Sequence, residues 1–416
     1  MHIKRWLFGF ALISALGTWH AAQVAPVQAK SDPPHWVGTF SAGLVAWDQP
    51  LDGSNQGFQN RTLRQILHVS IGGSWLRLRL SNAHGAKPLV VGSTHLALQK
   101  SGASIVPGSD RALTFGGQAT ITIPVGAWVV SDPIRLDVAP LSNVAVSLYV
   151  PNDTGPATWQ LPSLQTSYVS PAGDFTGTPE LPVEKTDPGR YWVSGLEVLA
   201  PPVVSAIVAV GDSLTHGFGS TPDTNQRWPD LLSARLNARP WRLNRGVLNQ
   251  GIGANRLLHE FSGNSAAARF DRDVIAQSGV SHVILSEGVV DLGLPGVTGA
   301  TEEQVSAAQM IQGFRQLIEK GRSRGLKMLG ATLTPFEGVA FPGFHSAEIE
   351  AKRQAINQWI RNGGAFDGVL DFDAVVRDPS APTRLLPAYD SGDHIHLNNA
   401  GYTAEANSID LGLFAP

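Results

Sequence analysis

The sequence contains no cysteine among its 416 residues. This absence excludes a disulfide framework, a thiolate metal site and a cysteine nucleophile. Charged residues are also scarce, at 16% of the chain, and the formal net charge is -3 with a sequence pI near 6.5. Such a balance lacks the basic bias of proteins that bind nucleic acids or anionic membrane surfaces. Hydrophobic residues make up 43%, which is enough for a packed core.

One apolar run lies near the amino terminus. Lys4 and Arg5 precede the stretch WLFGFALISALG, and a region of small residues follows and ends in VQA. The run is shorter than the roughly 20 residues that span a bilayer. The pattern predicts a signal peptide over residues 1–29, cleaved after Ala29, with Ala22 and Ala25 as alternative sites. We therefore expect a secreted or periplasmic bacterial protein that is not stably inserted in a membrane.

The rest of the chain divides into two regions of different character, as its length leads us to expect. Residues 30–200 contain short stretches of alternating polar and apolar residues, such as SWLRLRLSN and SNVAVSLYV, separated by turn clusters. This period of two predicts an all-β sandwich or barrel. After Pro201 and Pro202, over residues 201–416, apolar strands alternate with amphipathic helices. That alternation predicts an α/β domain whose parallel sheet is covered on both faces.

The expected elements of the α/β domain can be given by residue range. Apolar, β-branched stretches predict strands over 203–210, 242–249, 280–288, 326–335 and 368–376. Apolar residues at helical spacing predict helices over 227–238, 301–325 and 345–363, the second beginning at Thr301 with its following acidic residues. In a parallel sheet of this kind, functional residues lie at the carboxyl ends of the strands.

The first of these strands leads into AVGDSLTHGFG, residues 209–219. Ser213 in this segment has two interpretations. Its hydroxyl is either a nucleophile at the functional edge of the sheet, beside a helix N-terminus that favours developing negative charge, or a helix cap, a role that Asp212 fills equally well. His216 lies in the expected helix, where we predict a wall of the site rather than a reacting group.

A second candidate segment, YDSGDHIHLNNAGY, lies near the carboxyl terminus. A serine nucleophile needs a base, and an imidazole base needs a carboxylate that fixes its tautomer; His396 and Asp393, three positions apart, supply both. Two alternatives remain. His394 and His396 form an H-x-H pair that Asp393 extends to a metal site, or the segment is a solvated loop. No further cluster of ligands is evident in the sequence, so we predict neither a metal nor a cofactor.

Ser213 within GDSL, the blocks NQGIGANR and SEGVVDLG, and the final Asp393 and His396 follow one another in an order that resembles the GDSL family of esterases and lipases, also called SGNH hydrolases. The resemblance covers about residues 203–416. It implies a flavodoxin-like hydrolase domain with a parallel sheet and ester hydrolysis through an acyl-enzyme. Residues 30–200 resemble the all-β sandwich domain of secreted bacterial members. Thr215 disfavours the α/β-hydrolase nucleophile elbow, which has glycine at that position.

The resemblance also implies an oxyanion site built from a serine amide, a glycine amide and an asparagine side chain. Ser213 supplies the first. Ala254 stands at the glycine position, and Gly253 just before it is the alternative donor after a one-residue adjustment. Val290 stands at the asparagine position. Alanine keeps a backbone N–H, but valine cannot donate a hydrogen bond, and losing one such donor costs about 2.7–4 kcal/mol of transition-state stabilisation. We therefore expect a slow esterase.

Five further residues near these blocks carry predictions. Asn255, Arg256 and Glu287 are candidates to compensate for the missing donor, although arginine after a glycine-rich turn is more typical of a surface or ion-pairing residue. The alternative prediction for Glu287 is that it pairs with a neighbouring cation. Asp291 follows the missing asparagine, where it either orders a loop or acts directly. Trp228 is predicted to pack its helix against the sheet.

Together these patterns predict a secreted serine esterase in which His396 takes the proton of Ser213 and Asp393 orients His396. The expected substrate is a small-molecule or carbohydrate ester with a short or acetyl acyl group, and no nucleic-acid partner is expected. Two alternatives stay open. The acceptor is a sugar hydroxyl instead of water, which makes the protein an acyltransferase, or Val290 marks a weakened scaffold that only binds carbohydrate.

Overall fold

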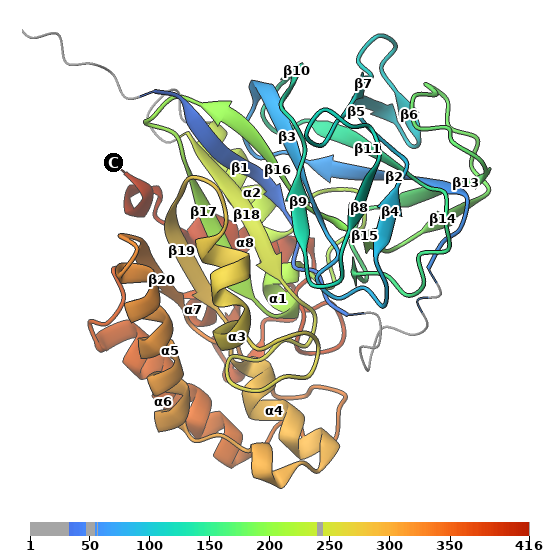
Figure 1. Cartoon of the computed structure of the whole chain (residues 1–416). Coiled ribbons are helices and arrows are strands. Elements are labelled where there is room, and N and C mark those ends of the chain that lie inside the picture. The colour runs from blue at the N-terminus through green and yellow to red at the C-terminus, as the bar shows by residue number, and fades with distance from the viewer. Residues whose placement is uncertain (1–32, 47–54, 56, 239–243, 416) are drawn as a thin grey trace, which may run out of the picture. The chain divides into compact units, whose positions relative to one another are not determined.

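Antiparallel strands come first along the chain and alternating strands and helices follow (Figure 1). The structure is a computed structural model, and it describes residues 33–46, 55, 57–238 and 244–415. The predicted signal peptide, residues 1–29, lies outside this range. Among the described residues, no helix is long and apolar enough to cross a bilayer.

The amino-terminal region is rich in antiparallel strands. Its two larger sheets follow the orders β1-β16-β3-β10, with β9 paired to β3, and β14-β13-β2-β11-β5-β6, with β7 paired to β5. The strands are β1 (His35–Ser41), β2 (Arg61–His68), β3 (Gly73–Ser81), β4 (Leu89–Val91), β5 (Ser93–Ser101), β6 (Ser104–Ile105), β7 (Arg111–Ala112), β8 (Ile121–Ile123), β9 (Trp128–Val130), β10 (Ile134–Val138), β11 (Asn143–Val150), β12 (Trp159–Gln160), β13 (Ser167–Ala172), β14 (Lys185–Asp187), β15 (Arg190–Tyr191) and β16 (Val193–Ala200).

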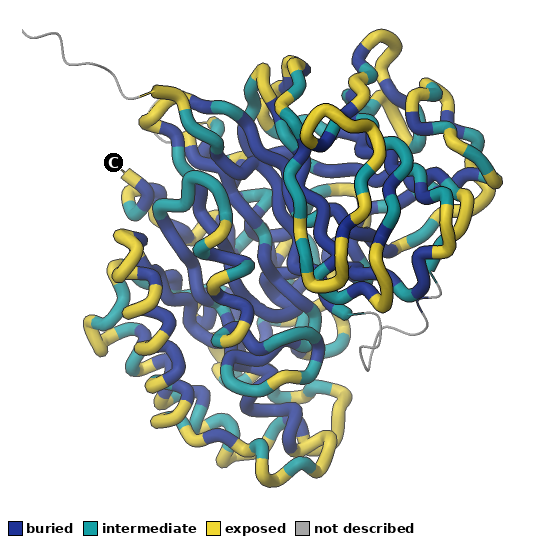
Figure 2. The backbone as a smooth tube through the Cα atoms, viewed as in Figure 1, coloured by how far each residue is buried: buried dark blue, intermediate teal, exposed yellow. Residues whose placement is uncertain are grey.

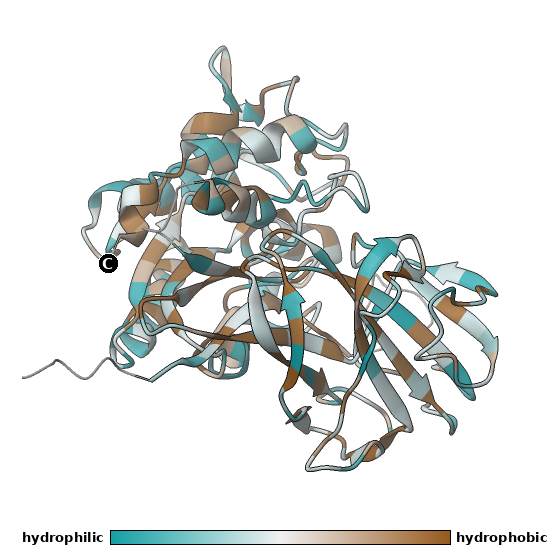
Figure 3. Cartoon of the chain, turned by 90° about the horizontal axis from the view of Figure 1, so that it is seen from above, coloured by the Kyte–Doolittle hydropathy of each residue, from teal (hydrophilic) through white to brown (hydrophobic). Residues whose placement is uncertain are grey.

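Strand β3 shows how the period of two builds this region. Leu76, Leu78 and Leu80 are fully buried, whereas Trp75, which directly precedes Leu76, is 45% exposed. Successive side chains of a strand point to opposite faces, so the three leucines share the face that meets the core. Figure 3 shows hydrophobic and hydrophilic colours alternating along strands of the sheets.

The carboxyl-terminal region contains a five-stranded parallel sheet in the order β18-β17-β19-β20-β21. Its central strand β17 has Ala206–Val210 completely buried, as expected of a strand covered on both faces. Gly211 at its end is in register with Gly251 and Ser286. The strands are β17 (Ser205–Gly211), β18 (Arg245–Gly251), β19 (Val280–Ser286), β20 (Lys327–Ala331) and β21 (Gly368–Leu370); β22 (Arg377–Asp378) and β23 (Ala381–Leu385) form a separate hairpin.

The described residues of the carboxyl-terminal region also form eight α-helices. Helix α2 packs against α8 and α8 against α7, whereas α5 contacts α6 and α3, so two groups of helices flank the strands (Figure 1). The helices are α1 (Ser213–His216), α2 (Trp228–Asn237), α3 (Ala266–Phe270), α4 (Val289–Thr298), α5 (Ala307–Arg322), α6 (Ala347–Asn362), α7 (Phe372–Val376) and α8 (Asn399–Ser408). Figure 2 shows the strands as the buried centre between exposed helix faces and loops.

The bounds of several predicted elements differ from the structure; the strand predicted over 326–335, for example, ends at Ala331. Two of the differences have a local cause. Helix α5 does not begin at Thr301, which lies in a short 3₁₀ turn; it begins after Ser306, whose side chain and that of Gln309 form a reciprocal capping box. The strand predicted over 368–376 ends at Leu370. Asp371 then caps helix α7 by accepting a hydrogen bond from the amide of Ala374 at 3.2 Å. In both places a local cap ends or starts the element.

Strand β1 of the amino-terminal region lies alongside β18, the edge strand of the parallel sheet. The amide of Gly38 donates to the carbonyl of Ser278 at 3.0 Å, and a Cβ at Gly246 would lie 2.1 Å from the carbonyl oxygen of Gly38. The two glycines thus permit direct contact between the backbones of the two regions. Pro201 and Pro202 lie between β16 and β17, and the division into separate domains at this point stays a prediction.

Candidate active site

The segment after β17 turns sharply and presents Ser213. Asp212 is the N-cap of the one-turn helix α1, and its Oδ1 accepts a hydrogen bond from the amide of Leu214 at 2.9 Å. A Cβ at Gly251 would lie 2.1 Å from the amide nitrogen of His216, so the turn rests directly on the end of β18. The cap role therefore belongs to Asp212, and the hydroxyl of Ser213 is left for another partner.

That partner is His396. Its Nε2 lies 2.8 Å from Oγ of Ser213, although 183 positions separate the two residues, and its Nδ1 lies 2.6 Å from Oδ2 of Asp393. The second carboxylate oxygen, Oδ1 of Asp393, accepts hydrogen bonds from the amides of Ile395 at 3.1 Å and His396 at 2.8 Å. The structure thus brings together the three residues predicted to act as nucleophile, base and orienting carboxylate.

The charge state of Asp393 suits an orienting role. Partial burial alone would raise its pKa, but the hydrogen bond and charge of His396 and the two backbone amides outweigh burial and hold the pKa well below its usual range. Asp393 is therefore ionised at neutral pH and favours the tautomer of His396 with the proton on Nδ1. In that tautomer Nε2 is free to accept the hydroxyl proton of Ser213.

Buried acids lie behind the nucleophile turn. Asp212 is 1% exposed, and burial raises its pKa to about 7, against the opposing effects of its cap hydrogen bond and the charge of His396. Glu287 is 3% exposed, and burial together with the charge of Asp212 raises its pKa well above its usual value. Neither carboxylate oxygen of Glu287 has a hydrogen-bond partner among the described residues. The prediction that Glu287 pairs with a cation is therefore wrong.

The loop after β18 carries the predicted oxyanion residue Ala254. Its φ of +54° is in the left-handed region, which favours glycine and costs a residue with a Cβ roughly 1–2 kcal/mol. The backbone of this loop is fixed from outside: the amides of Leu257 and Leu258 donate to the two carboxylate oxygens of Asp291 at 2.6 and 3.0 Å. Asp291 is fully buried, so of its two predicted roles the structure supports the ordering of this loop.

The side chains near this loop are committed to other partners. Side-chain Nδ2 of Asn255 donates to the carbonyls of Ser262 and Asn264, and Arg256 is buried and forms an ion pair with Glu303. The ion-pairing interpretation of Arg256 is thus confirmed. The Asn255 side chain is therefore engaged elsewhere, whereas Nε of Arg256 has no hydrogen-bond partner among the described residues.

The alternative metal site at His394 and His396 is not formed by the described residues. Nδ1 of His394 lies 2.5 Å from Oδ2 of Asp390, whereas His396 turns to Asp393, so the two imidazoles have separate carboxylate partners. Among the described histidines and acids, no group of three or more has an arrangement that could hold a metal ion.

Comparison with known proteins identifies a family for the region that contains Ser213, Asp393 and His396. Residues 209–404 match the GDSL-like lipase/acylhydrolase family. The chain carries a GDSL-like acylhydrolase domain. Lipases and acylhydrolases of this kind cleave carboxylic esters, so the GDSL domain is that of a carboxylic ester hydrolase.

Solved structures similar to this chain include three named esterases. An aryl esterase of M. smegmatis is 16% identical, with a TM-score of 0.39, and the match covers 49% of this chain and 95% of that one. An acetylxylan esterase from Geobacillus stearothermophilus is 19% identical (TM-score 0.38; 49% and 91% covered), and a carbohydrate acetylesterase from Sinorhizobium meliloti is 14% identical (TM-score 0.36; 49% and 94% covered). A search of the curated proteins found no match.

Val290 and Trp228 complete the predicted residues of the GDSL domain. Val290 lies in the first turn of α4 and is 5% exposed, so an apolar side chain occupies the position where the resemblance implies asparagine. Trp228 is fully buried, and its ring meets that of Phe372 edge to face with centroids 5.4 Å apart. It packs α2 against α7, the helix that follows the edge strand β21.

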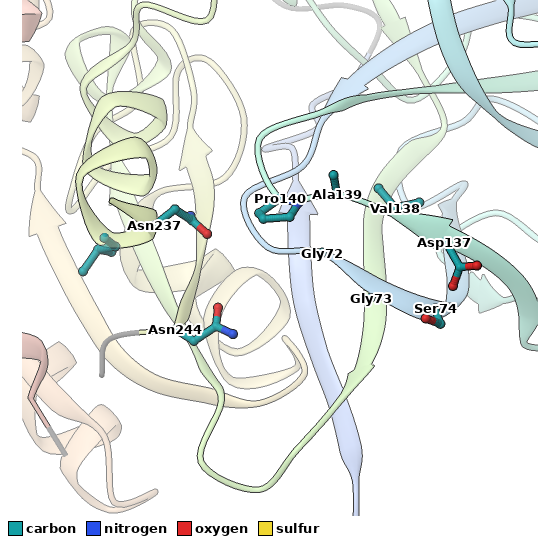
Figure 4. Close-up of a pocket in the computed structure, with 10 residues that line it drawn as sticks. Gly72, Gly73, Ser74, Asp137, Val138, Ala139, Pro140, Asn237 and Asn244 are labelled. Carbon is teal, nitrogen blue, oxygen red and sulfur yellow. The ribbon is translucent and has the colours of Figure 1, made fainter. Parts of the chain in front are cut away.

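A cavity of about 660 Å³ lies away from these residues (Figure 4). Asn237 and Asn244 line one side of it, and the Gly72–Ser74 turn and Pro140 line the other. Asn244 directly precedes β18, so the cavity borders the amino ends of the parallel strands. Ser213 follows the carboxyl end of β17, and the cavity is therefore no part of the site in the GDSL domain.

Sequence reasoning missed two features of the site. Asp390 and His394 form a second acid–imidazole pair beside the first, which the spacing of YDSGDHIH allows but does not require. Phe218 places its ring 5.1 Å from that of His396. The signal for Phe218 was present in the sequence, because glycine stands on either side of it in HGFGS.

Proposed function

We propose that the protein is an exported serine esterase that hydrolyses short-chain carboxylic esters through Ser213, His396 and Asp393. The observation that carries this proposal is the continuous hydrogen-bond chain from Oγ of Ser213 through both nitrogens of His396 to the carboxylate of Asp393, at 2.8 and 2.6 Å. A serine activated by an oriented imidazole is the arrangement that acyl transfer requires.

The reaction proceeds in two stages. Oγ of Ser213 attacks the ester carbonyl carbon while Nε2 of His396 takes its proton, and the tetrahedral intermediate collapses as His396 returns that proton to the departing alcohol oxygen. Water then attacks the acyl-enzyme, gives a proton to His396, and releases the carboxylic acid as Ser213 regains its hydrogen. The amides of Ser213 and Ala254 stabilise the oxyanion, with no side-chain donor from position 290.

Ala254 and Val290 influence the rate rather than the reaction class. The left-handed φ of Ala254 is the conformation that a glycine would adopt there, and Asp291 fixes the same loop, which supports the backbone amide at 254 as one donor. With valine at position 290, one donor fewer is available, which raises the barrier by about 2.7–4 kcal/mol. The proposed enzyme is therefore slow with unactivated esters.

The architecture and the amino terminus support the remaining parts of the proposal. The order β18-β17-β19-β20-β21 is that of flavodoxin-like sheets, and the two larger antiparallel sheets share one buried core as in a β-sandwich. The basic, apolar and small-residue segments of residues 1–29 support export. For an exported enzyme we propose acetylated small molecules or carbohydrates as substrates.

Covalent labelling tests the proposal. A fluorophosphonate should label the full chain at Ser213, located by peptide mass mapping, and His396→Ala should abolish the label while circular dichroism stays unchanged. The control is His394→Ala, which removes the neighbouring imidazole and should keep the label. Folded wild-type protein that is not labelled would favour the carbohydrate-binding alternative. Product analysis with and without an added glycan separates free acid from transferred acyl group, and hence hydrolase from acyltransferase.

A further inference from the structure

Phe218 lies directly beside the base of the proposed triad. Its ring centroid is 5.1 Å from that of His396, with a tilt of 34° between the planes, and it is one of the few large apolar side chains that stay substantially exposed, at 37%. It also meets the buried ring of His216 edge to face at 6.2 Å. A partly exposed aromatic ring thus lies beside the proposed catalytic histidine.

The backbone around Phe218 fixes this position. Gly217 and Gly219 have φ values of 102° and 86°, which favour glycine, and a Cβ at Gly219 would lie 2.5 Å from the carbonyl oxygen of Leu397. The amide of Phe218 donates to the carbonyl of Ser213 at 3.0 Å, and its own carbonyl accepts from the hydroxyl of Tyr402 at 2.6 Å. The GFG turn therefore holds the ring rigidly.

Phe218 also reaches the oxyanion loop. A Cβ built on Gly253 would lie 3.9 Å from Cε2 of Phe218, which is ordinary contact distance. Gly253 directly precedes Ala254, whose amide is one proposed donor. The ring therefore spans the gap between the base and the loop that receives the carbonyl oxygen.

This placement identifies the part of an ester that the ring would touch. His396 must return a proton to the departing alcohol oxygen, so that oxygen lies next to Nε2 when the first intermediate collapses. A side chain packed against His396 and bordering the oxyanion loop therefore faces the alcohol portion. An exposed aromatic face attracts flat apolar surfaces, such as an aryl ring or the C–H face of a pyranose.

We propose that Phe218 is a specificity-determining residue that binds the alcohol moiety of the ester and favours alcohols with a flat ring, either aryl or pyranose. The inference rests on the proposed serine esterase function and adds the class of alcohol to it. His216 behind the ring is buried, and burial and the charge of Arg227 lower its pKa to about 4, so it presents a neutral ring to Phe218 at neutral pH.

Acetate esters isolate this effect, because every acetate yields the same acetyl-enzyme and differs only in its alcohol. The experiment compares kcat/KM for benzyl acetate, a monoacetylated methyl pyranoside and ethyl acetate in wild type, Phe218→Ala, Phe218→Leu and Phe218→Tyr. Phe218→Ala and Phe218→Leu should lower the ratio of ring ester to ethyl ester about tenfold, and Phe218→Tyr should restore it. The ring ester whose ratio falls, benzyl or pyranoside, identifies the source of the flat face.

Controls separate recognition from support of His396. Trp75→Ala removes another exposed aromatic side chain, from strand β3, and should leave all ratios unchanged. The ratio of benzyl acetate to benzyl butyrate should not respond to Phe218, since the acyl group lies on the other side of the carbonyl. Equal losses for all esters, or unchanged ratios in Phe218→Ala, would overturn the inference alone. Wild-type protein that hydrolyses none of these esters would refute the proposed function and with it the inference.

Discussion

Asp212→Asn should make the protein more stable at pH 8 but not at pH 4. Asp212 is 1% exposed, and burial raises its pKa from 3.8 to about 7, whereas the unfolded chain keeps the lower value. Between these values the folded state binds the proton that the unfolded state has lost, so stability falls as pH rises. The difference corresponds to a loss of about 4 kcal/mol by pH 8. Asparagine does not titrate and escapes this loss.

The substitution is otherwise conservative, which makes the comparison clean. The cap uses Oδ1 of Asp212, and asparagine offers the same oxygen to the amide of Leu214 and is an equally good N-cap. The charge of Asp212 also raises the pKa of Glu287 and of Glu405, so its removal lowers both values and acts in the same direction, toward greater stability at pH 8. The figure of about 4 kcal/mol refers to the titration of Asp212 itself.

The assay is urea unfolding at pH 4 and pH 8, followed by circular dichroism, for wild type, Asp212→Asn and Asp212→Ala. The asparagine variant should match wild type at pH 4 and exceed it by about 4 kcal/mol at pH 8. The alanine variant lacks the cap and should lie about 1 kcal/mol below the asparagine variant at both pH values. A difference between wild type and Asp212→Asn that does not change with pH would refute the reasoning.

Two further predictions concern the oxyanion loop. Asp291→Asn keeps one acceptor where two amides donate, so it should cost about 1–3 kcal/mol of unfolding free energy and slow ethyl acetate hydrolysis; unchanged urea midpoint and rate would contradict the role of Asp291. Val290→Asn restores a donor and should raise kcat for acetyl esters, by up to about 100- to 1000-fold, whereas Val290→Leu should not. A folded Val290→Asn variant with wild-type kcat would mean that another group already stabilises the oxyanion.

The residues that sequence predicts best are those whose chemistry is local. Asp393 and His396 share one turn, and their pairing through Nδ1 follows from a three-residue spacing. Ser213 follows a strand whose apolar run is unmistakable, and the sheet order brings its end to the same edge as the later strands. The sequence predicts that Arg256 forms an ion pair but does not identify the partner, because Glu303 lies 47 positions away.

What could not be predicted depends on long-range burial. Glu287 looks like an ordinary charged residue in the sequence, and only the fold shows that it is enclosed without a partner beside Asp212. The start of α5 differs from its prediction for another reason. Thr301 and its acidic neighbours form a plausible helix start, but the capping box of Ser306 and Gln309 satisfies two donors at once and begins the helix six residues later.

We propose that the antiparallel region supports the proposed oxyanion loop, although it contributes no reacting residue. Oγ of Ser41 donates to the carbonyl of Asn249 at 3.2 Å, and a Cβ at Gly43 would lie 2.7 Å from the side chain of Ile252. Asn249 is in strand β18, and Ile252 opens the loop that holds Ala254. Because a left-handed alanine persists only when its surroundings fix it, contacts from β1 and from Asp291 on opposite ends of the loop supply that constraint. The two regions therefore meet beside the proposed oxyanion loop.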